Sequence, residues 1–245
     1  MMHSRDLIEQ YKSYVQDWRR YFHTHPELSN EEFETTKTLA KELESMGVEV
    51  HVDEERGTGL IGIIHGAKSG KAIVLRADID ALPVQEHNTF EFKSAVDGKM
   101  HACGHDGHMA ILLGAAKMLI SMKDRIEGDV YLAFQPAEET GAGAPDFIKF
   151  GDWFEKIDAI FGGHVWIDLP AGLISVEEGP RMAASSKITI NVKGKQGHGA
   201  QPHQAIDAVV VASAIVMNLQ TVVSRNVSAL DSLVLTIGNI HSGSE

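Results

Sequence analysis

The sequence predicts an α/β fold built on a mixed, largely parallel sheet flanked by helices. Strand-like and helix-like stretches alternate through most of the chain, which is the pattern of α/β domains. Two of the strand-like stretches are almost continuous apolar runs, as expected for strands covered on both faces. The chain has 245 residues, of which 43% are hydrophobic and 23% charged, so it can form one large domain or two smaller ones.

Two helices come first. Apolar residues recur at helical spacing over 5–22, which predicts an amphipathic helix that ends before a His-Pro pair. Ser29 followed by Glu32 has the spacing of a capping box and predicts the start of the second helix. Gly47 predicts where this helix ends, because glycine readily adopts the left-handed conformation found after helix C-termini.

The strands of the predicted sheet follow these helices. The runs KAIVLRADID and GDVYLAFQP have the apolar composition of doubly covered strands. In chain order we expect strands at 48–54, 59–66 and 71–80, a helix at 107–122, a strand at 128–136, a short helix at 145–150 and a strand at 158–166.

The pattern changes after Gly179. We expect a half-exposed strand at 187–194, an apolar helix at 204–223 and a further strand at 232–241. This βαβ piece is expected to be part of a second domain, although two strands and one helix make a poor independent core. The predicted domains therefore span 1–182 and 183–245.

Composition and charge narrow the class of protein. The formal net charge of −12 argues against nonspecific nucleic-acid binding, which needs clustered Lys and Arg. A single cysteine excludes an intramolecular disulfide and is typical of a reducing, cytoplasmic setting. The start lacks a basic region followed by an apolar core, and the longest apolar run, Ala208 to Met217, is far too short to span a bilayer. We therefore expect a cytoplasmic protein with no membrane partner.

Side chains that can bind metals gather in one short stretch and at the ends of predicted strands. The stretch MHACGHDGHM, residues 100–109, contains three histidines, one aspartate and Cys103, the only cysteine of the chain. Open α/β sheets bind ligands beyond the carboxyl ends of their strands, so groups that follow different strands can converge there. The groups at the ends of predicted strands or in the adjoining loops are Asp78 and Asp80, Glu138 and Glu139, and His164.

Each of these groups has a plain structural alternative. Two adjacent glutamates are usually a solvated pair, a lone histidine at a strand end is usually structural, and an Asp-x-Asp pair can cap a turn. One cysteine and three histidines in a glycine-punctuated turn are hard to explain by packing, which favours a metal site. A shell of Cys, His and Glu with a spare carboxylate suits hydrolysis, because the metal acidifies its bound water and the carboxylate takes the proton.

Two other hypotheses stay open at this point. Cys103 could be a nucleophile with His101 or His105 as its base, although this leaves the two glutamates and His164 without a role. The chain could also be a non-catalytic binding or assembly protein built on an enzyme scaffold.

Five motifs, taken in order, resemble those of the zinc-type amidohydrolases of the aminoacylase and carboxypeptidase clan, peptidase family M20. They are LRADIDALPVQE, MHACGHDGHMAILLGAA, FQPAEETGAGA, GGHVW and GKQGHGAQPH. The branch is that of hippurate hydrolase, N-acetyl-diaminopimelate deacetylase and the plant auxin–amino-acid conjugate hydrolases. The resemblance runs from about Trp18 to the last residue and does not specify the substrate.

The resemblance implies a site with two divalent metal ions, which are Zn, Mn, Co or Ni. Cys103, His105, Glu139 and His164 match the metal ligands of the family, and one further histidine ligand is expected from beyond residue 245. Glu138 matches the general base that takes a proton from the attacking water.

The resemblance also implies roles for other residues. Asp80 matches an aspartate that orients a ligand, whereas Asp78 stands where sister branches carry a metal-binding histidine, so its role is open. His101 and His108 are not family ligands and are expected to support the turn, with His101 kept as a candidate. His198 matches a histidine that reaches the active site of a partner chain and polarises the scissile carbonyl.

The implied fold is a metallo-exopeptidase-like catalytic domain with an inserted α+β, ferredoxin-like lid that pairs two subunits. Only half of this lid is expected here, because the chain ends partway through it, and His241 is not a credible replacement ligand. The resemblance thus implies a homodimer that hydrolyses the amide bond of N-acyl amino acids or short peptides. It also implies that the present chain is a truncated form of low activity.

Overall fold

The structure is a computed structural model that describes residues 4–141, 143–179 and 182–243. It divides into two compact units, Met1–Gly179 and Pro180–Glu245, and each is described by itself. Among the described residues, the first unit contains the sheet and the second is built around one α-helix.

The first unit is built on a five-stranded mixed sheet with the order β1-β2-β4-β3-β5 among its described residues. β3 runs parallel to β4 and β5, whereas β2 runs antiparallel to β1 and β4. The predicted fold class, a mixed sheet flanked by helices, is confirmed. The strands are β1 (Glu49–Val52), β2 (Leu60–His65), β3 (Lys68–Asp78), β4 (Glu127–Gln135) and β5 (Ala159–Gly162).

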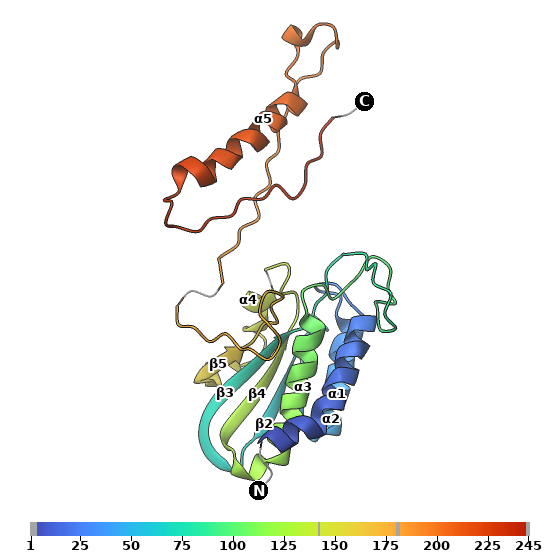
Figure 1. Cartoon of the computed structure of the whole chain (residues 1–245), viewed down its shortest axis with the longest axis vertical. Helices are drawn as coiled ribbons and strands as arrows, with labels where there is room; N and C mark the ends of the chain where they lie inside the picture. The colour runs from blue at the N-terminus through green and yellow to red at the C-terminus, as the bar shows by residue number, and fades with distance from the viewer. Residues whose placement is uncertain (1–3, 142, 180–181, 244–245) are drawn as a thin grey trace. The chain divides into compact units, whose positions relative to one another are not determined.

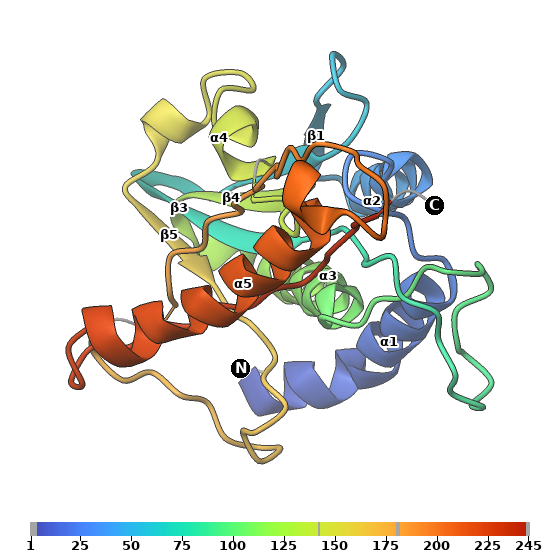
Figure 2. The same cartoon turned by 90° about the horizontal axis from the view of Figure 1, so that it is seen from above.

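Helices cover both faces of this sheet (Figure 1). One face carries the three longer helices of the unit, and the other carries the short helix α4; Figure 2 shows α3 and α4 on opposite sides of the sheet. The helices are α1 (Ser4–Thr24), α2 (Phe33–Ser45), α3 (His105–Ser121) and α4 (Gly143–Phe147), with 3-10 turns at Lys123–Arg125 and Phe154–Lys156. All four lie where the sequence predicts a helix, within a few residues.

Apolar side chains on both faces of the sheet explain this arrangement. In β4, Leu132 and Phe134 join the core beneath α1, α2 and α3, while Tyr131 and Ala133 join the core beneath α4. This alternation is that of a strand covered on both faces. Each fully buried side chain of the size of Phe134 stabilises the fold by roughly 1.5–3 kcal/mol relative to an exposed one.

The predicted capping box at the start of α2 is wrong. Glu27 caps this helix instead: its carboxylate accepts the N–H groups of the second and third helical residues at 3.2 and 2.7 Å. Ser29 donates its hydroxyl to Asp80, and Glu32 accepts the backbone N–H of Ala137. Distant partners therefore replace the local hydrogen bonds that the spacing predicts, and the segment before α2 is connected directly to the ends of β3 and β4.

The second unit contains the predicted apolar helix, α5 (Ala208–Thr221). It begins after Asp207, whose carboxylate accepts the N–H groups of Val209 and Val210 at 2.8 and 3.1 Å. This N-terminal cap explains where the helix starts. A 3-10 turn, Pro202–Gln204, precedes α5, and a π-helical turn, Val222–Asn226, follows it.

The two strands predicted for the second unit are not formed. Residues 187–194 and 232–241 are not in strands, and the described residues of this unit contain one isolated bridge, between Lys195 and Ile206. The predictions at 187–194 and 232–241 are therefore wrong. An alternating pattern indicates a strand only where a neighbouring strand is available to pair with it, and α5 offers no such partner.

Helix α5 and the turn after it form one apolar helix, Ala208–Asn226, of 19 residues. By length and composition alone this helix could cross a membrane, so the apolar segment is longer than the run noted in the sequence. This is weak evidence for a membrane span, because core helices of soluble proteins pass the same criterion. The absence of a membrane partner therefore stays a prediction.

Candidate metal centre

Three parallel strands and one helix bring the candidate ligands to the same edge of the sheet. Asp78 ends β3 and pairs in register with Gln135, which ends β4, while β5 lies on the other side of β3. The candidate side chains follow these ends: Asp80 follows β3, Glu138 and Glu139 follow β4, His164 follows β5, and Cys103 and His105 lie at the N-terminus of α3. This is the carboxyl edge at which open α/β sheets bind ligands.

Three groups of possible ligating atoms share His105, one with Cys103 and His164, one with Glu138 and Glu139, and one with Asp78 and His108. The Sγ of Cys103 lies 3.4 Å from Nε2 of His164, and ligand atoms of these two residues and His105 lie within 4.8 Å of one another. Nε2 of His105 also lies 3.8 Å from Oε1 of Glu139 and 4.0 Å from Oε2 of Glu138. The four residues expected as ligands and the expected base are therefore brought together around one imidazole.

Two of these ligating atoms are buried without a hydrogen bond, and one of them, Nε2 of His105, lies 3.5 Å from Oδ2 of Asp78. Nε2 of His105 and Oε1 of Glu139 are shielded from water and have no hydrogen bond within the part of the chain that the structure describes. An unpaired buried polar group costs about 1–3 kcal/mol. A divalent cation would pair both atoms, and a donor set of thiolate, imidazole and carboxylate suits zinc and neighbouring transition metals. The residues present therefore fit a metal.

Asp80 fixes the orientation of His105. Nδ1 of His105 lies 2.8 Å from the backbone oxygen of Asp80 and 3.2 Å from its carboxylate, which directs Nε2 toward the other ligands. Oδ2 of Asp80 also accepts the hydroxyl of Ser29 at 2.7 Å and the backbone N–H of Glu139 at 3.0 Å. One buried carboxylate thus connects three segments that carry or support candidate ligands.

Asp78 and His108 form a second buried connection. His108 donates through Nδ1 to Oδ1 of Asp78 and accepts the backbone N–H of Val165 through Nε2 at 2.9 Å. Arg76 donates to Oδ2 of Asp78 at 2.9 Å. Burial acts to raise the pKa of Asp78, but the hydrogen bond from His108 and the charges of His105 and Arg76 lower it to about 2. Asp78 is therefore an ionised anchor for the loop that carries His164.

His101 lies outside the groups of ligating atoms found among the described residues. Its side chain is buried, and neither ring nitrogen has a hydrogen-bond partner in the described part of the chain. Burial lowers the pKa of His101 to about 4, so the ring is neutral at physiological pH. A neutral, buried ring is consistent with the supporting role that the sequence predicts for this histidine.

The environment of Cys103 weighs against a cysteine nucleophile. Burial, followed by the carboxylates of Glu139, Glu138 and Asp78, raises the pKa of the Cys103 thiol to about 12. A nucleophilic cysteine needs a lowered pKa and a base in contact. The imidazole in contact with the thiol is His164, not His101 or His105 as that hypothesis requires. Binding to a cation would instead deprotonate the thiol directly.

Gly104 allows the turn between Cys103 and His105 to approach the loop after β5. It is the N-cap of α3 and has φ +94°, in the left-handed region that favours glycine. A Cβ at this position would overlap Cγ2 of Val165, the residue after His164. A glycine is therefore required both by the backbone conformation and by the close packing of the two segments that carry ligands.

Ser29 and Glu32 were not predicted as members of the site, and His108 was predicted only to support the turn. All three bond to residues that carry or position candidate ligands. A signal for Glu32 was present: it lies four, seven and eleven residues before Thr36, Leu39 and Leu43, the buried face of α2. A carboxylate on the buried face of a helix needs a partner, which pointed to a role beyond capping.

His198 lies in the second unit. Its side chain is exposed, and its Nδ1 accepts the backbone N–H of Ala200 at 3.1 Å. The candidate ligands belong to the first unit, and the role of His198 stays a prediction.

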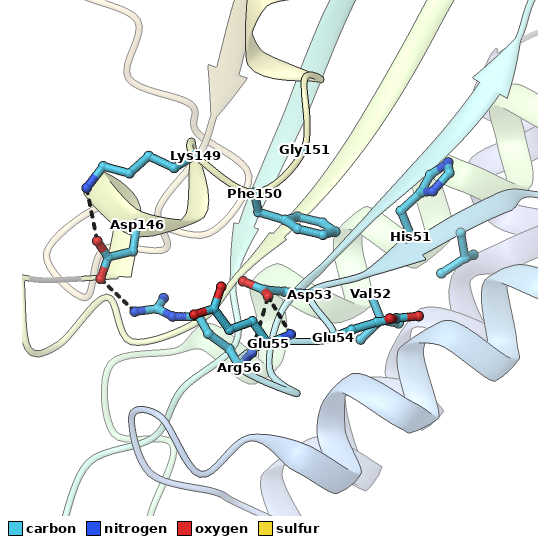
Figure 3. A pocket seen from close by; sticks show the side chains of 11 residues that line it. His51, Val52, Asp53, Glu54, Glu55, Arg56, Asp146, Lys149, Phe150 and Gly151 are labelled. Carbon is cyan, nitrogen blue, oxygen red and sulfur yellow. Dashed lines mark hydrogen bonds and ion pairs between the residues drawn. The ribbon is translucent and has the colours of Figure 1, made fainter.

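A groove of about 1010 Å³ lies between the β1–β2 turn and α4 (Figure 3). Arg56 crosses it to donate to Oδ2 of Asp146 at 2.8 Å, and Lys149 donates to Oδ1 of the same carboxylate at 3.3 Å. None of the candidate ligands lines this groove. Arg56, Asp146 and Lys149 pair with one another, so we assign the chemistry to the carboxyl edge of the sheet and not to this groove.

Known proteins are similar in sequence to this chain. Residues 74–233 match the family described as Peptidase family M20/M25/M40. The chain is 41% identical to the N-acyl-L-amino acid amidohydrolase of Geobacillus stearothermophilus, over 97% of this chain and 64% of that one. It is 45% identical to the N-acetyl-L-cysteine deacetylase of Bacillus subtilis, over 92% and 54% of the two chains. It is 46% identical to an IAA-amino acid hydrolase of Arabidopsis thaliana, over 90% and 51%.

Solved structures show the same fold. A Bacillus subtilis protein described as a dinuclear metal binding peptidase of the M20 family has a TM-score of 0.67 and 44% identity, over 70% of this chain and 48% of that one. A protein of methicillin resistant Staphylococcus aureus has a TM-score of 0.75 and 38% identity, over 97% and 64%. The chain spans between about half and two thirds of the length of the curated relatives named above.

Proposed function

The chain belongs to peptidase family M20/M25/M40, and on this premise we propose that it carries the metal-binding part of a hydrolase that cleaves the amide bond of N-acyl amino acids or short peptides. The observation that carries the proposal is the pair of buried, unpartnered atoms, Nε2 of His105 and Oε1 of Glu139, beside the thiol and imidazole of Cys103 and His164. The names of the relatives support the same class of substrate.

We assign the ligands of two divalent ions to Cys103, His105, Glu139 and His164. When bound, the ions supply Lewis-acid chemistry that makes water nucleophilic at neutral pH. Zn, Mn, Co and Ni all suit this donor set, because imidazole and carboxylate bind each of them and the thiolate favours the softer ones.

Glu138 is the proposed general base. Its side chain is 41% exposed, against 20% for that of Glu139, so Glu138 can meet water and substrate while Glu139 faces the ligands. Glu138 takes the proton of the attacking water and returns it to the leaving amine. Asp80 positions His105 and Glu139 through the hydrogen bonds described above.

Three further assignments follow from the sequence and from the resemblance. His198 is proposed to polarise the scissile carbonyl from a partner chain, which stabilises the oxyanion of the tetrahedral intermediate. The second unit is proposed to be part of a lid that forms a homodimer, with the domain boundary near residue 182. The protein is proposed to act in the cytoplasm.

Metal removal tests the proposed function. We expect a chelator to abolish hydrolysis of N-acetyl and N-benzoyl amino acids, and Zn²⁺, Mn²⁺, Co²⁺ or Ni²⁺ to restore it. Glu138→Gln should lower kcat at least ~100-fold while the protein still binds metal, as measured by calorimetry. Glu155→Gln, an exposed glutamate of the same unit, is the matched control.

The alternatives give different results. A cysteine nucleophile would be indifferent to the chelator, and a non-catalytic scaffold would be indifferent to Glu138→Gln. Because the relatives are longer, each variant is assayed both in this chain and in the complete reading frame. Full-length protein that binds no divalent metal would contradict the proposal.

A further inference from the structure

We propose that Glu32 is a positioning residue that keeps Ala137 in a left-handed conformation and so directs Glu138 and Glu139 toward the site. This inference rests on the proposed function of those two glutamates. It assigns a role to a buried carboxylate that neither binds metal nor contacts substrate in the proposed mechanism.

Glu32 reaches the end of β4 from the start of α2. Its side chain is fully buried, and Oε1 accepts the backbone N–H of Ala137 at 2.8 Å, across 105 residues of sequence. Oε2 is buried with no partner in the described part of the chain. Burying a carboxyl group in this way is unfavourable unless the bond that it makes is needed. Through the N–H of Ala137, Glu32 connects the segment before α2 to the turn after β4.

Ala137 has the backbone conformation that needs this support. Its φ is +53°, a left-handed value that residues with a Cβ rarely adopt, and it is one of two non-glycine residues with positive φ among those described. Its carbonyl oxygen accepts the N–H of Gly143 at 3.1 Å and the hydroxyl of Thr140 at 3.0 Å. Both polar groups of the Ala137 backbone are thus fixed by other residues.

The direction of the next two side chains depends on this turn. Ala137 immediately precedes Glu138 and Glu139, and the N–H of Glu139 is bonded to Asp80. Two carboxylates, Glu32 and Asp80, therefore bond the first and third N–H groups of the turn. Burial and the charge of Asp80 raise the pKa of Glu32 to about 7, whereas the hydrogen bond from the N–H of Ala137 acts to lower it.

The test compares Glu32→Leu, Glu32→Gln and the control Glu31→Gln, each with Ala137 and with Ala137→Gly. Glu31 is the exposed neighbour of Glu32, and its side chain pairs with Lys99. Three measurements are made: amide hydrogen exchange of residues 137–139, Co²⁺ affinity, and kcat with KM. Glycine adopts positive φ freely, so in the Ala137→Gly background the turn no longer needs Glu32 to hold its left-handed conformation.

We expect Glu32→Leu to speed exchange at 137–139 and to weaken Co²⁺ binding and kcat by about 10-fold or more, with KM little changed. Glu32→Gln keeps an acceptor for Ala137 and should stay within about 3-fold of the native chain. In the Ala137→Gly background the effect of Glu32→Leu should shrink to about 3-fold or less. Glu31→Gln should change none of these values.

Equal losses from Glu32→Leu in both backgrounds would overturn the proposal, as would a loss with Glu32→Gln as large as that with Glu32→Leu. If Glu32→Leu destabilises the chain too much for these assays, the thermal midpoint of unfolding is measured instead. A midpoint of the Glu32→Leu variant that Ala137→Gly does not raise would equally overturn the proposal. A native chain that binds no Co²⁺ would contradict the proposed function. The rate of amide hydrogen exchange at Ala137 would still show whether Glu32 supports the turn.

Discussion

The turn at Gly104 and the turn at Ala137 both place the backbone in the left-handed region directly before candidate metal ligands or the base. Gly104 has φ +94° and precedes His105, and Ala137 has φ +53° and precedes Glu138 and Glu139. The first turn uses the residue that adopts this conformation without strain. The second uses a residue that does not, and it is bonded to Glu32 through its N–H.

The two turns owe their left-handed conformations to different causes. At Gly104 the local sequence is sufficient, and space is the constraint, because a Cβ would overlap Val165. At Ala137 the conformation depends on groups from distant segments, which are Glu32 before α2 and, two residues on, Asp80 after β3. Substitutions should therefore act through sterics at the first turn and through lost hydrogen bonds at the second.

The largest effect is expected from Gly104→Ala. The added Cβ meets both a strained φ and the side chain of Val165, so the unfolding free energy should fall by about 4 kcal/mol and metal affinity should fall with it. The measurements are urea denaturation with chelator present and calorimetric titration with Co²⁺.

Gly98→Ala is the matched control for this change. Gly98 has φ +74° but open space around its Cα, so it reports the cost of the backbone conformation alone, about 1 kcal/mol. If Gly104→Ala is no more destabilising than Gly98→Ala, close packing on Val165 does not explain the glycine.

The same contrast explains how much of the molecule could be predicted. Motifs with strong local signals gave correct elements: the helical periodicity of α1, the apolar runs of β3 and β4, and Gly47, which has φ +77° just after α2. The groups that follow the strands were expected at one sheet edge because parallel strands share that edge. The structure brings their ligating atoms within a few ångströms of His105.

The predictions that failed depended on partners that a sequence does not display. Ser29 and Glu32 have the spacing of a local cap, but their side chains bond to Asp80 and Ala137, which are far away in the chain. The segments 187–194 and 232–241 have the alternation of strands, but no strand in the described second unit pairs with them. Local pattern is sufficient for α5, whose hydrogen bonds are internal, and insufficient for a sheet.

A pH dependence of intermediate size is expected from the turn at Ala137. Burial raises the pKa of Glu32 from 4.5 to about 7 in the folded chain. Between these values the folded chain keeps a proton that the unfolded chain has released, so the unfolding free energy should fall as pH rises, by up to about 3 kcal/mol. Denaturation in chelator at pH 4.5 to 7.5 measures this fall.

Glu32→Gln should remove this part of the pH dependence, because an amide does not titrate in this range. Glu31→Gln serves as the control, since its exposed side chain should leave the slope unchanged. If the unfolding free energies of the native chain and of Glu32→Gln change in parallel between pH 4.5 and 7.5, Glu32 does not keep an extra proton in the folded chain. The turn at Ala137 would then not differ from the turn at Gly104 in its dependence on pH.

The smallest effect is expected from Ser29→Ala, because this change removes one of two hydrogen bonds to the same oxygen of Asp80. Ser29 donates to the same oxygen of Asp80 that accepts the N–H of Glu139, so its loss leaves that acceptor with one partner fewer but not empty. The unfolding free energy should fall by about 1 kcal/mol, against almost no change for Ser45→Ala, whose hydroxyl bonds to an exposed helix carbonyl. A loss as large as that from Glu32→Leu would mean that Asp80, and not Glu32, is the main support of the turn that carries Glu138 and Glu139.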